Sequence, residues 1–155
     1  MFDEDQIVAF NLIKDGHNLL VSGQAGVGKT FLVKKGCKIF KKTPKKAEIV
    51  CSTGIAATHF SDLGAQKLHR WAGIENGRHM NEHLLQLVVT VERFISVKKN
   101  FLNVDVLFID EISMISSKVL CQVEFLIRNV RTSTQYFGGV QIVLVGDFYQ
   151  SPCAK

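Results

Sequence analysis

The sequence of 155 residues has few of the features that mark secreted or membrane proteins. No apolar run approaches the ~18 residues needed to span a bilayer, and the acidic N-terminus lacks the basic and apolar regions of a secretion signal. The four cysteines form no C-x-x-C pair, and three of them lie in apolar stretches: Cys37, Cys51, Cys121 and Cys153. We therefore expect a soluble protein with reduced thiols, without disulfides, zinc or a membrane partner.

The charge is modest, because 19 lysines and arginines face 14 acidic residues and give a net charge of +5. This excess favours anionic partners, nucleic acid or nucleotide, although it also occurs on ordinary soluble proteins. With 46% hydrophobic residues, the chain is long enough for one compact domain with a core. A basic patch is best explained as a solvated loop, with a nuclear-import signal as the alternative: Lys41, Lys42, Lys45 and Lys46.

Helical and extended patterns alternate along the chain. Apolar spacing and capping signals predict helices at residues 3–14, 30–40, 55–60, 82–98 and 117–131. Short apolar runs predict strands at residues 18–22, 48–52, 104–109 and 141–145. Such strands between helices indicate an α/β fold of three layers, with a mainly parallel sheet covered on both faces. Ligands of these sheets bind at the carboxyl ends of the strands.

A complete phosphate-loop pattern stands between the first predicted strand and the next helix, where that motif belongs: Gly23, Gln24, Ala25, Gly26, Val27, Gly28, Lys29 and Thr30. The glycines let backbone N–H groups and the positive helix end face the phosphates of a nucleotide. Lys29 adds a charge at the β and γ phosphates, and the Thr30 hydroxyl can ligate Mg²⁺. We therefore expect ATP and Mg²⁺ as cofactors.

The third predicted strand ends in two carboxylates, Asp110 and Glu111, at the same edge of the sheet. Asp110 is the candidate magnesium ligand, and Glu111 is the candidate base for the attacking water. The alternative is that both acids only favour the positive end of the next helix, but Ser113, Ser116 and Ser117 are better placed to cap it. Gln150, which follows the fourth strand, can reach the terminal phosphate.

Taken together, the motifs resemble those of the Pif-type (petite integration frequency) DNA helicases, which are RecD-like members of superfamily 1. The resemblance covers nearly the whole chain and rests on Gln6, the phosphate loop, residues 51–57, residues 68–74, residues 110–114 and residues 137–150. It implies a RecA-like sheet in which the strand at 141–145 lies between the phosphate-loop strand and the strand before Asp110. It also implies an ATP-dependent DNA helicase.

The resemblance assigns further roles to single residues. Gln6 would contact adenine, Gln150 would sense the γ-phosphate, and a track for single-stranded DNA would be lined by Thr53, Gly54, His69 and Trp71. A hydroxyl and N–H groups at a helix start can hold a phosphate, and an indole can stack on a base. Without the resemblance, Trp71 is better explained as a core residue and His69 as a surface histidine.

The resemblance also implies parts that this sequence does not carry. A second RecA-like domain, with an arginine acting across the cleft, would complete the site of a monomeric motor that works on single-stranded DNA and DNA junctions. The implied setting is genome maintenance in the nucleus or the mitochondrion. One competing hypothesis stays open, namely a nucleotide-binding fragment without turnover. A second is disfavoured, namely a zinc protease, which the H-x-x-E-H pattern of residues 79–83 suggests.

Overall fold

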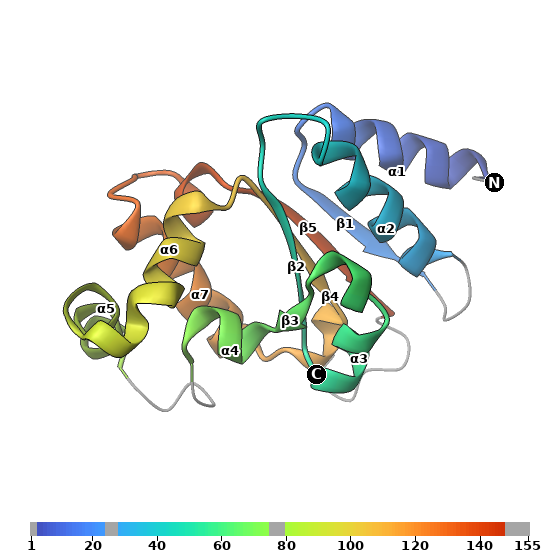
Figure 1. Cartoon of the computed structure of the whole chain (residues 1–155). Helices are drawn as coiled ribbons and strands as arrows, with labels where there is room; N and C mark the ends of the chain where they lie inside the picture. Colours follow the sequence, from blue (N-terminus) through green and yellow to red (C-terminus); the bar gives the residue numbers. More distant parts are fainter. Residues whose placement is uncertain (1–2, 24–27, 75–79, 148–155) are drawn as a thin grey trace.

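The computed structural model describes residues 3–23, 28–74 and 80–147. In these ranges five parallel strands form one sheet (Figure 1) in the order β1-β5-β4-β2-β3. The strands are β1 (Leu19–Ser22), β2 (Ala47–Cys51), β3 (Gln66–Lys67), β4 (Val106–Asp110) and β5 (Gln141–Gly146). The expected position of β5, between the phosphate-loop strand and the strand of Asp110, is therefore confirmed.

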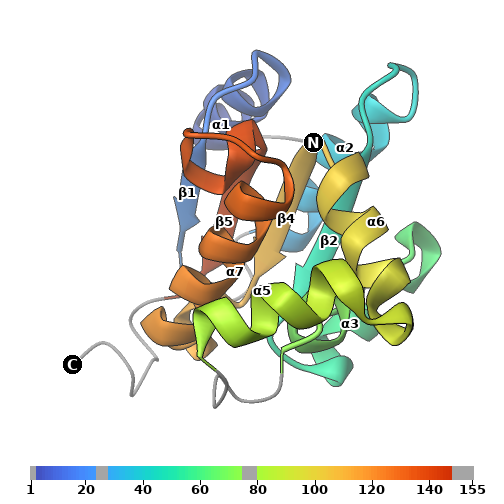
Figure 2. The ribbon, with the colours of Figure 1, turned by 90° about the vertical axis from the view of Figure 1, so that its left-hand side faces the viewer.

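The helices lie on both faces of this sheet and make it the middle of three layers. They are α1 (Glu4–Lys14), α2 (Lys29–Phe40), α3 (Gly54–Thr58), α4 (Leu68–Ala72), α5 (Asn81–Thr90), α6 (Ile95–Asn103) and α7 (Ser117–Val130). Figure 1 shows α1 and α2 on one face and α4 to α7 on the other, and Figure 2 shows α5, α6 and α7 in front of the sheet. No helix in the described ranges is long and apolar enough to cross a membrane.

Strand β4 shows why continuous apolar runs predict the strands of this sheet. Val106 and Phe108 pack in the core shared with α1 and α2, whereas Leu107 and Ile109 pack in the core shared with α4 to α7. All four side chains are fully buried. Because both faces of β4 are covered, the strand needs an apolar residue at every position, as parallel sheets usually do.

One predicted helix is wrong, because residues 82–98 form parts of two helices. Helix α5 ends at Thr90, Val91 is extended, and a short 3-10 turn, Glu92–Phe94, leads into α6. The β-branched run of residues 88–91 weakens helix propensity at this point. The break lets Val88 on α5 and Val97 on α6 enter the same core cluster. Strand β3 and helix α4 were not predicted at all.

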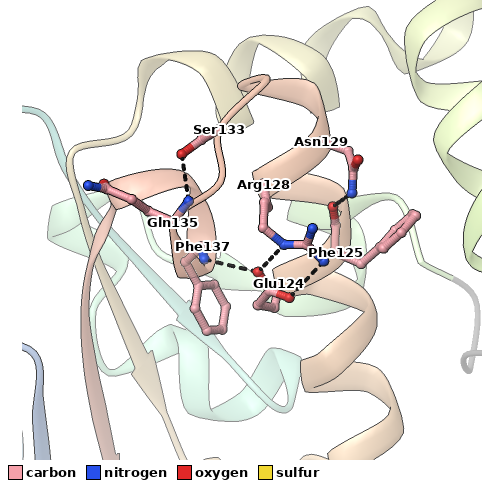
Figure 3. A network of polar contacts seen from close by, with 7 residues as sticks. All are labelled: Glu124, Phe125, Arg128, Asn129, Ser133, Gln135 and Phe137. Atoms are coloured by element: carbon pink, nitrogen blue, oxygen red, sulfur yellow. Dashed lines mark hydrogen bonds and ion pairs between the residues drawn. The ribbon is translucent and has the colours of Figure 1, made fainter.

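The connection from α7 to β5 contains the Phe137-Gly138-Gly139 segment in an unusual backbone conformation. Phe137 has φ 51° and Gly138 has φ 63°. Figure 3 shows how Glu124 of α7 holds this turn, because its carboxylate accepts a hydrogen bond from the Phe137 N–H (3.1 Å) and one from the Arg128 Nε (2.9 Å). One ion pair on α7 therefore fixes the approach to β5.

Arg131, which follows α7, ties the same turn to the end of α6. Its guanidinium donates hydrogen bonds to four backbone carbonyls, those of Phe101, Leu102, Val104 and Gly138. The carbonyls at a helix C-terminus have no partner within the helix, and a cation satisfies them well. The side chain thus joins α6, α7 and the turn before β5.

Candidate functional site

A cavity of about 810 Å³ opens where the carboxyl ends of the central strands meet α2. Its lining consists of Gly28, Lys29, Thr30, Phe31, Lys34, His59, Asp110, Glu111, Ser113, Met114, Gly146 and Asp147. Five of the predicted site residues are among them, although they come from segments about 80 residues apart: Gly28, Lys29, Thr30, Asp110 and Glu111. The order of the strands produces this meeting, since β5 alone separates β1 from β4.

The C-terminal end of the phosphate loop lines one side of the cavity. Gly28 has φ 84°, a conformation that favours glycine, and it directly precedes α2. The Lys29 ammonium donates a hydrogen bond to the Gly23 carbonyl and so joins the two ends of the loop. The start of α2, with its free N–H groups and positive end, therefore lines the cavity. The middle of the loop lies outside the described residues: Gln24, Ala25, Gly26 and Val27.

Asp110 lies opposite the phosphate loop, at the end of β4. Burial raises the pKa of this carboxyl group, and a hydrogen bond from the Glu111 backbone opposes the shift. The charge of Glu111 raises the pKa and that of the Lys29 ammonium lowers it, with smaller effects. A desolvated carboxylate with a nearby hydroxyl, that of Thr30, is a set of hard oxygen ligands. Mg²⁺ is commonly held by one or two carboxylates together with nucleotide phosphates, so this small set fits the ion.

Burial and the nearby acids together alter the pKa of a neighbouring thiol, that of Cys51. Its thiol lies on β2 directly beside Asp110 on β4 and is fully buried. Burial and the charges of Asp110 and Glu111 raise the pKa of this thiol to about 12. Cys51 is therefore an inert core thiol, as expected for the cysteines. Cys37 is also buried and free, whereas Cys121 is free and exposed.

Glu111 has a backbone conformation that is rare for its residue type, with φ 53° and ψ 46°. Its carboxylate accepts a hydrogen bond from the Ser52 hydroxyl at 2.7 Å. Ser52 follows β2 and is only 7% exposed. Sequence reasoning missed this serine, yet the signal was available, since a polar residue that ends an apolar strand lies at the same sheet edge as the acids.

Gln6 lies on the other side of the phosphate loop, beside a smaller cavity of about 300 Å³. Its side chain accepts a hydrogen bond from the Asp3 N–H (3.0 Å), while the Asp3 carboxylate accepts one from the Gln6 N–H (2.8 Å). The predicted capping box is thus confirmed. The Gln6 amide also donates to the Gly28 carbonyl (3.4 Å), which links α1 to the loop.

Three of the residues assigned to the DNA track lie near the surface. Thr53 caps α3 by accepting a hydrogen bond from the Ala56 N–H (3.1 Å), and Gly54 begins that helix; both are exposed. His69 on α4 is partly buried, and this burial, followed by the charge of Lys67, lowers the pKa of its imidazole. In the described part of the chain its Nδ1 has no hydrogen-bond partner.

Trp71 does not line a surface track, so its expected stacking role is wrong for this structure. The indole is 1% exposed and lies edge-on to Phe101, with 5.4 Å between ring centroids. Its N–H donates to the Glu48 carboxylate at 2.9 Å. The alternative explanation, a core tryptophan, is confirmed. The last predicted residue, Gln150, lies outside the described residues.

A phosphate-loop sequence after β1, paired acids after β4 and β5 between these strands define the class: this is a RecA-like P-loop nucleotide-binding domain. The model of the PIF1-like helicase family matches residues 1–154. The chain belongs to the PIF1-like helicase family.

Curated relatives and solved structures agree with this assignment. The chain is 34% identical to the ATP-dependent DNA helicase PIF1 of Danio rerio and 35% identical to that of Homo sapiens, over 96% of this chain and 22% of each relative. It matches the crystal structure of Pif1 helicase from Candida albicans with a TM-score of 0.86 and 31% identity, over 97% of this chain and 33% of that one. Bacteroides Pif1 in complex with ADP-AlF4 matches with a TM-score of 0.73 and 32% identity, over 100% and 34%. The chain thus spans about a fifth of its curated relatives.

Proposed function

We propose that this chain is the ATP-binding part of a DNA helicase motor that couples ATP hydrolysis to DNA unwinding. The observation that carries the proposal is the shared cavity, where Lys29 and Thr30 of the phosphate loop face Asp110 and Glu111. The relatives are named ATP-dependent DNA helicases, and one related structure holds ADP-AlF4. A basic residue, a hydroxyl and two carboxylates in one cavity are the groups that phosphoryl transfer requires.

Each residue has a defined task in this proposal. Lys29 and the start of α2 hold the β and γ phosphates, and Gln6 contacts the adenine from the smaller cavity. Glu111 orients the attacking water and takes its proton, while Gln150 senses the γ-phosphate. Thr30 and Asp110 hold Mg²⁺, which when bound neutralises charge on the phosphates.

DNA is the second partner in the proposal. Among solved relatives, Bacteroides Pif1 has been captured bound to single-stranded DNA, and two coordinating Pif1 helicases unwind forked duplex DNA. On this chain Thr53 and Gly54 are exposed and His69 is partly exposed, so these residues can contact the phosphates of a single strand. The net charge of +5 favours the same partner. We further propose a monomeric motor with a second RecA-like domain, which acts at DNA junctions in the repair, recombination and telomere maintenance of nuclear or mitochondrial genomes.

The test compares two variants in a protein that joins this chain to a second RecA-like domain. Glu111→Gln should retain ATP binding but lower turnover by ~10² to 10⁴, the usual loss for a positioned base. Lys29→Ala should weaken ATP binding itself, because it removes a contact to the phosphates. Glu92→Gln, an exposed position on the turn between α5 and α6, is the matched control and should behave as the parent. Parental turnover in Glu111→Gln would refute the base assignment.

A further inference from the structure

Ser52 connects two parts of the molecule that the proposed function treats separately. Its hydroxyl donates to the Glu111 carboxylate at 2.7 Å, a distance typical of a strong bond between a hydroxyl and an ionised acceptor. The next residue, Thr53, caps α3 at the exposed turn proposed to hold DNA. A single residue therefore stands between the DNA side of the domain and the carboxylate proposed to activate water.

The direction of this hydrogen bond decides what it does. Strand β4, which carries Glu111 at its end, has β2 as one neighbour and β5 as the other, and β1 lies beyond β5. Ser52 follows β2, so the bond holds the carboxylate at the β2 side of the cavity, whereas the phosphate loop lines the same cavity from the β1 side. The Ser52 hydroxyl also occupies one acceptor position of the carboxylate, which leaves fewer positions for an attacking water.

The Glu111 side chain has two relevant positions, one at Ser52 and one toward the phosphate loop. The Glu111 backbone lies in the left-handed region directly before the 3-10 turn Ile112–Met114, and rotation of the side chain is the simplest way for its carboxylate to change partners. Ser52 is 7% exposed and sits directly after a paired strand residue, Cys51. A shift of the β2–α3 turn by about 1 Å would lengthen a 2.7 Å hydrogen bond beyond useful range.

We propose that Ser52 is a positioning residue that holds Glu111 in a resting orientation until single-stranded DNA occupies the turn at Thr53 and Gly54. The phosphate backbone of DNA moves the turn, the hydrogen bond breaks, and Glu111 rotates toward the phosphate loop. Ser52 thereby restrains ATP turnover in the absence of DNA. This inference rests on the proposed function, because it requires Glu111 to be the base.

The experiment measures ATP turnover with and without saturating oligothymidine, in the protein that contains the second RecA-like domain. Ser52→Ala should raise DNA-free turnover roughly tenfold, the scale on which loss of one charge-assisted hydrogen bond shifts a two-state equilibrium. Turnover at saturating DNA should stay within about twofold of the parent, because the bond is already broken there. The ratio of the two rates is the decisive readout, since a merely structural role would lower both.

Three further variants complete the design. Ser52→Thr keeps the hydroxyl and should restore the parental ratio, whereas Ser52→Cys keeps the volume with a weak donor and should behave like alanine. The second of these remains informative if Ser52→Ala folds poorly. Ser61→Ala, an exposed serine in the 3-10 turn Ser61–Leu63, is the matched control.

The outcomes separate this inference from the proposed function. The double variant Ser52→Ala with Glu111→Gln should be as slow as Glu111→Gln alone, because the faster turnover expected of Ser52→Ala still requires the Glu111 carboxylate. If Ser52→Ala leaves the ratio unchanged, or lowers the DNA-saturated rate without raising the DNA-free rate, the resting role is overturned while Glu111 remains the base. If Glu111→Gln turns over ATP at the parental rate, the base assignment in the proposed function fails, and this inference fails with it.

Discussion

At the scale of single residues, Asp110 is a position where function and stability conflict. Burial disfavours its ionised form and raises its pKa, and this effect outweighs the hydrogen bond that the carboxylate accepts from the Glu111 backbone. Strain or unfavourable charge at a site is commonly retained because ligand binding requires it. The carboxylate that is suited to a metal ion therefore destabilises the nucleotide-free domain.

Asp110→Asn should accordingly stabilise the nucleotide-free chain at neutral pH, by about 0.5–2 kcal/mol. The folded pKa is raised above the ordinary value of 3.8, so the folded state binds more protons and the penalty grows as pH rises through the folded pKa. The gain should thus vanish below the ordinary pKa, where the aspartate is neutral in both states. Thermal unfolding at several pH values measures it, with the exposed Asp62→Asn as control. An equal gain at low pH would contradict the electrostatic explanation.

Residue patterns predicted the nucleotide site better than the DNA side, for a physical reason. Lys29, Thr30 and Asp110 belong to motifs whose position after a strand fixes where they lie. Trp71 carries no such constraint, since helical spacing does not say which face of a short helix is buried. Its burial depends on partners distant in sequence, Glu48 and Phe101.

At the scale of elements, the segments with the clearest apolar pattern were predicted most accurately. The long helix at residues 117–131 and the apolar strands agree with α7, β2, β4 and β5 within about two residues, as their strong periodicity allows. Strand β3 has two residues and α4 has five, too few to show any period. The break between α5 and α6 was missed because the apolar spacing continues across it, and only packing reveals the turn.

The contact between Arg131 and the turn before β5 can be tested by substituting Gly138. Gly138 has φ 63°, and a Cβ there would lie 2.6 Å from the Arg131 Cδ. Gly64 has a similar φ of 72° with no atom within 4 Å of such a Cβ. Gly64→Ala should therefore show backbone strain alone, about 1–2 kcal/mol, and Gly138→Ala should lose more because it also displaces Arg131.

Chemical denaturation of both variants gives the comparison directly. The difference between the two losses isolates the contact with Arg131, whose guanidinium serves four carbonyls. Equal losses in the two variants would mean that Arg131 moves aside freely and does not tie the turn to α6.

At the scale of the whole molecule, the chain spans about a fifth of its curated relatives, and the proposed motor includes a second domain. We expect the isolated chain to bind Mg-ATP and gain about 2.7 kcal/mol of stability at 100 times its Kd, a gain that EDTA reduces. It should hydrolyse ATP slowly and not unwind duplex DNA. Joining a second domain that provides an arginine should raise turnover by ~10³ to 10⁵.

Calorimetry and a phosphate-release assay on a verified monomer check both halves of this expectation. Rapid DNA-stimulated turnover by the isolated chain would show that no outside arginine is needed. Binding without any gain in turnover, even with the second domain joined, would instead favour a nucleotide-binding module that does not act as a motor.

The order of the strands also governs how this domain can be made in a cell. Strand β1, which leads into the phosphate loop, is an edge strand paired with β5, and Leu19 lies opposite Val143. The pairing of β1 with β5 joins segments from opposite ends of the described chain, so it must wait until nearly all of the domain has left the ribosome. Parallel pairings of this kind also form slowly. The phosphate loop is therefore among the first segments synthesised, but it acquires its supporting strand among the last. During translation, the nascent domain cannot bind nucleotide before β5 emerges.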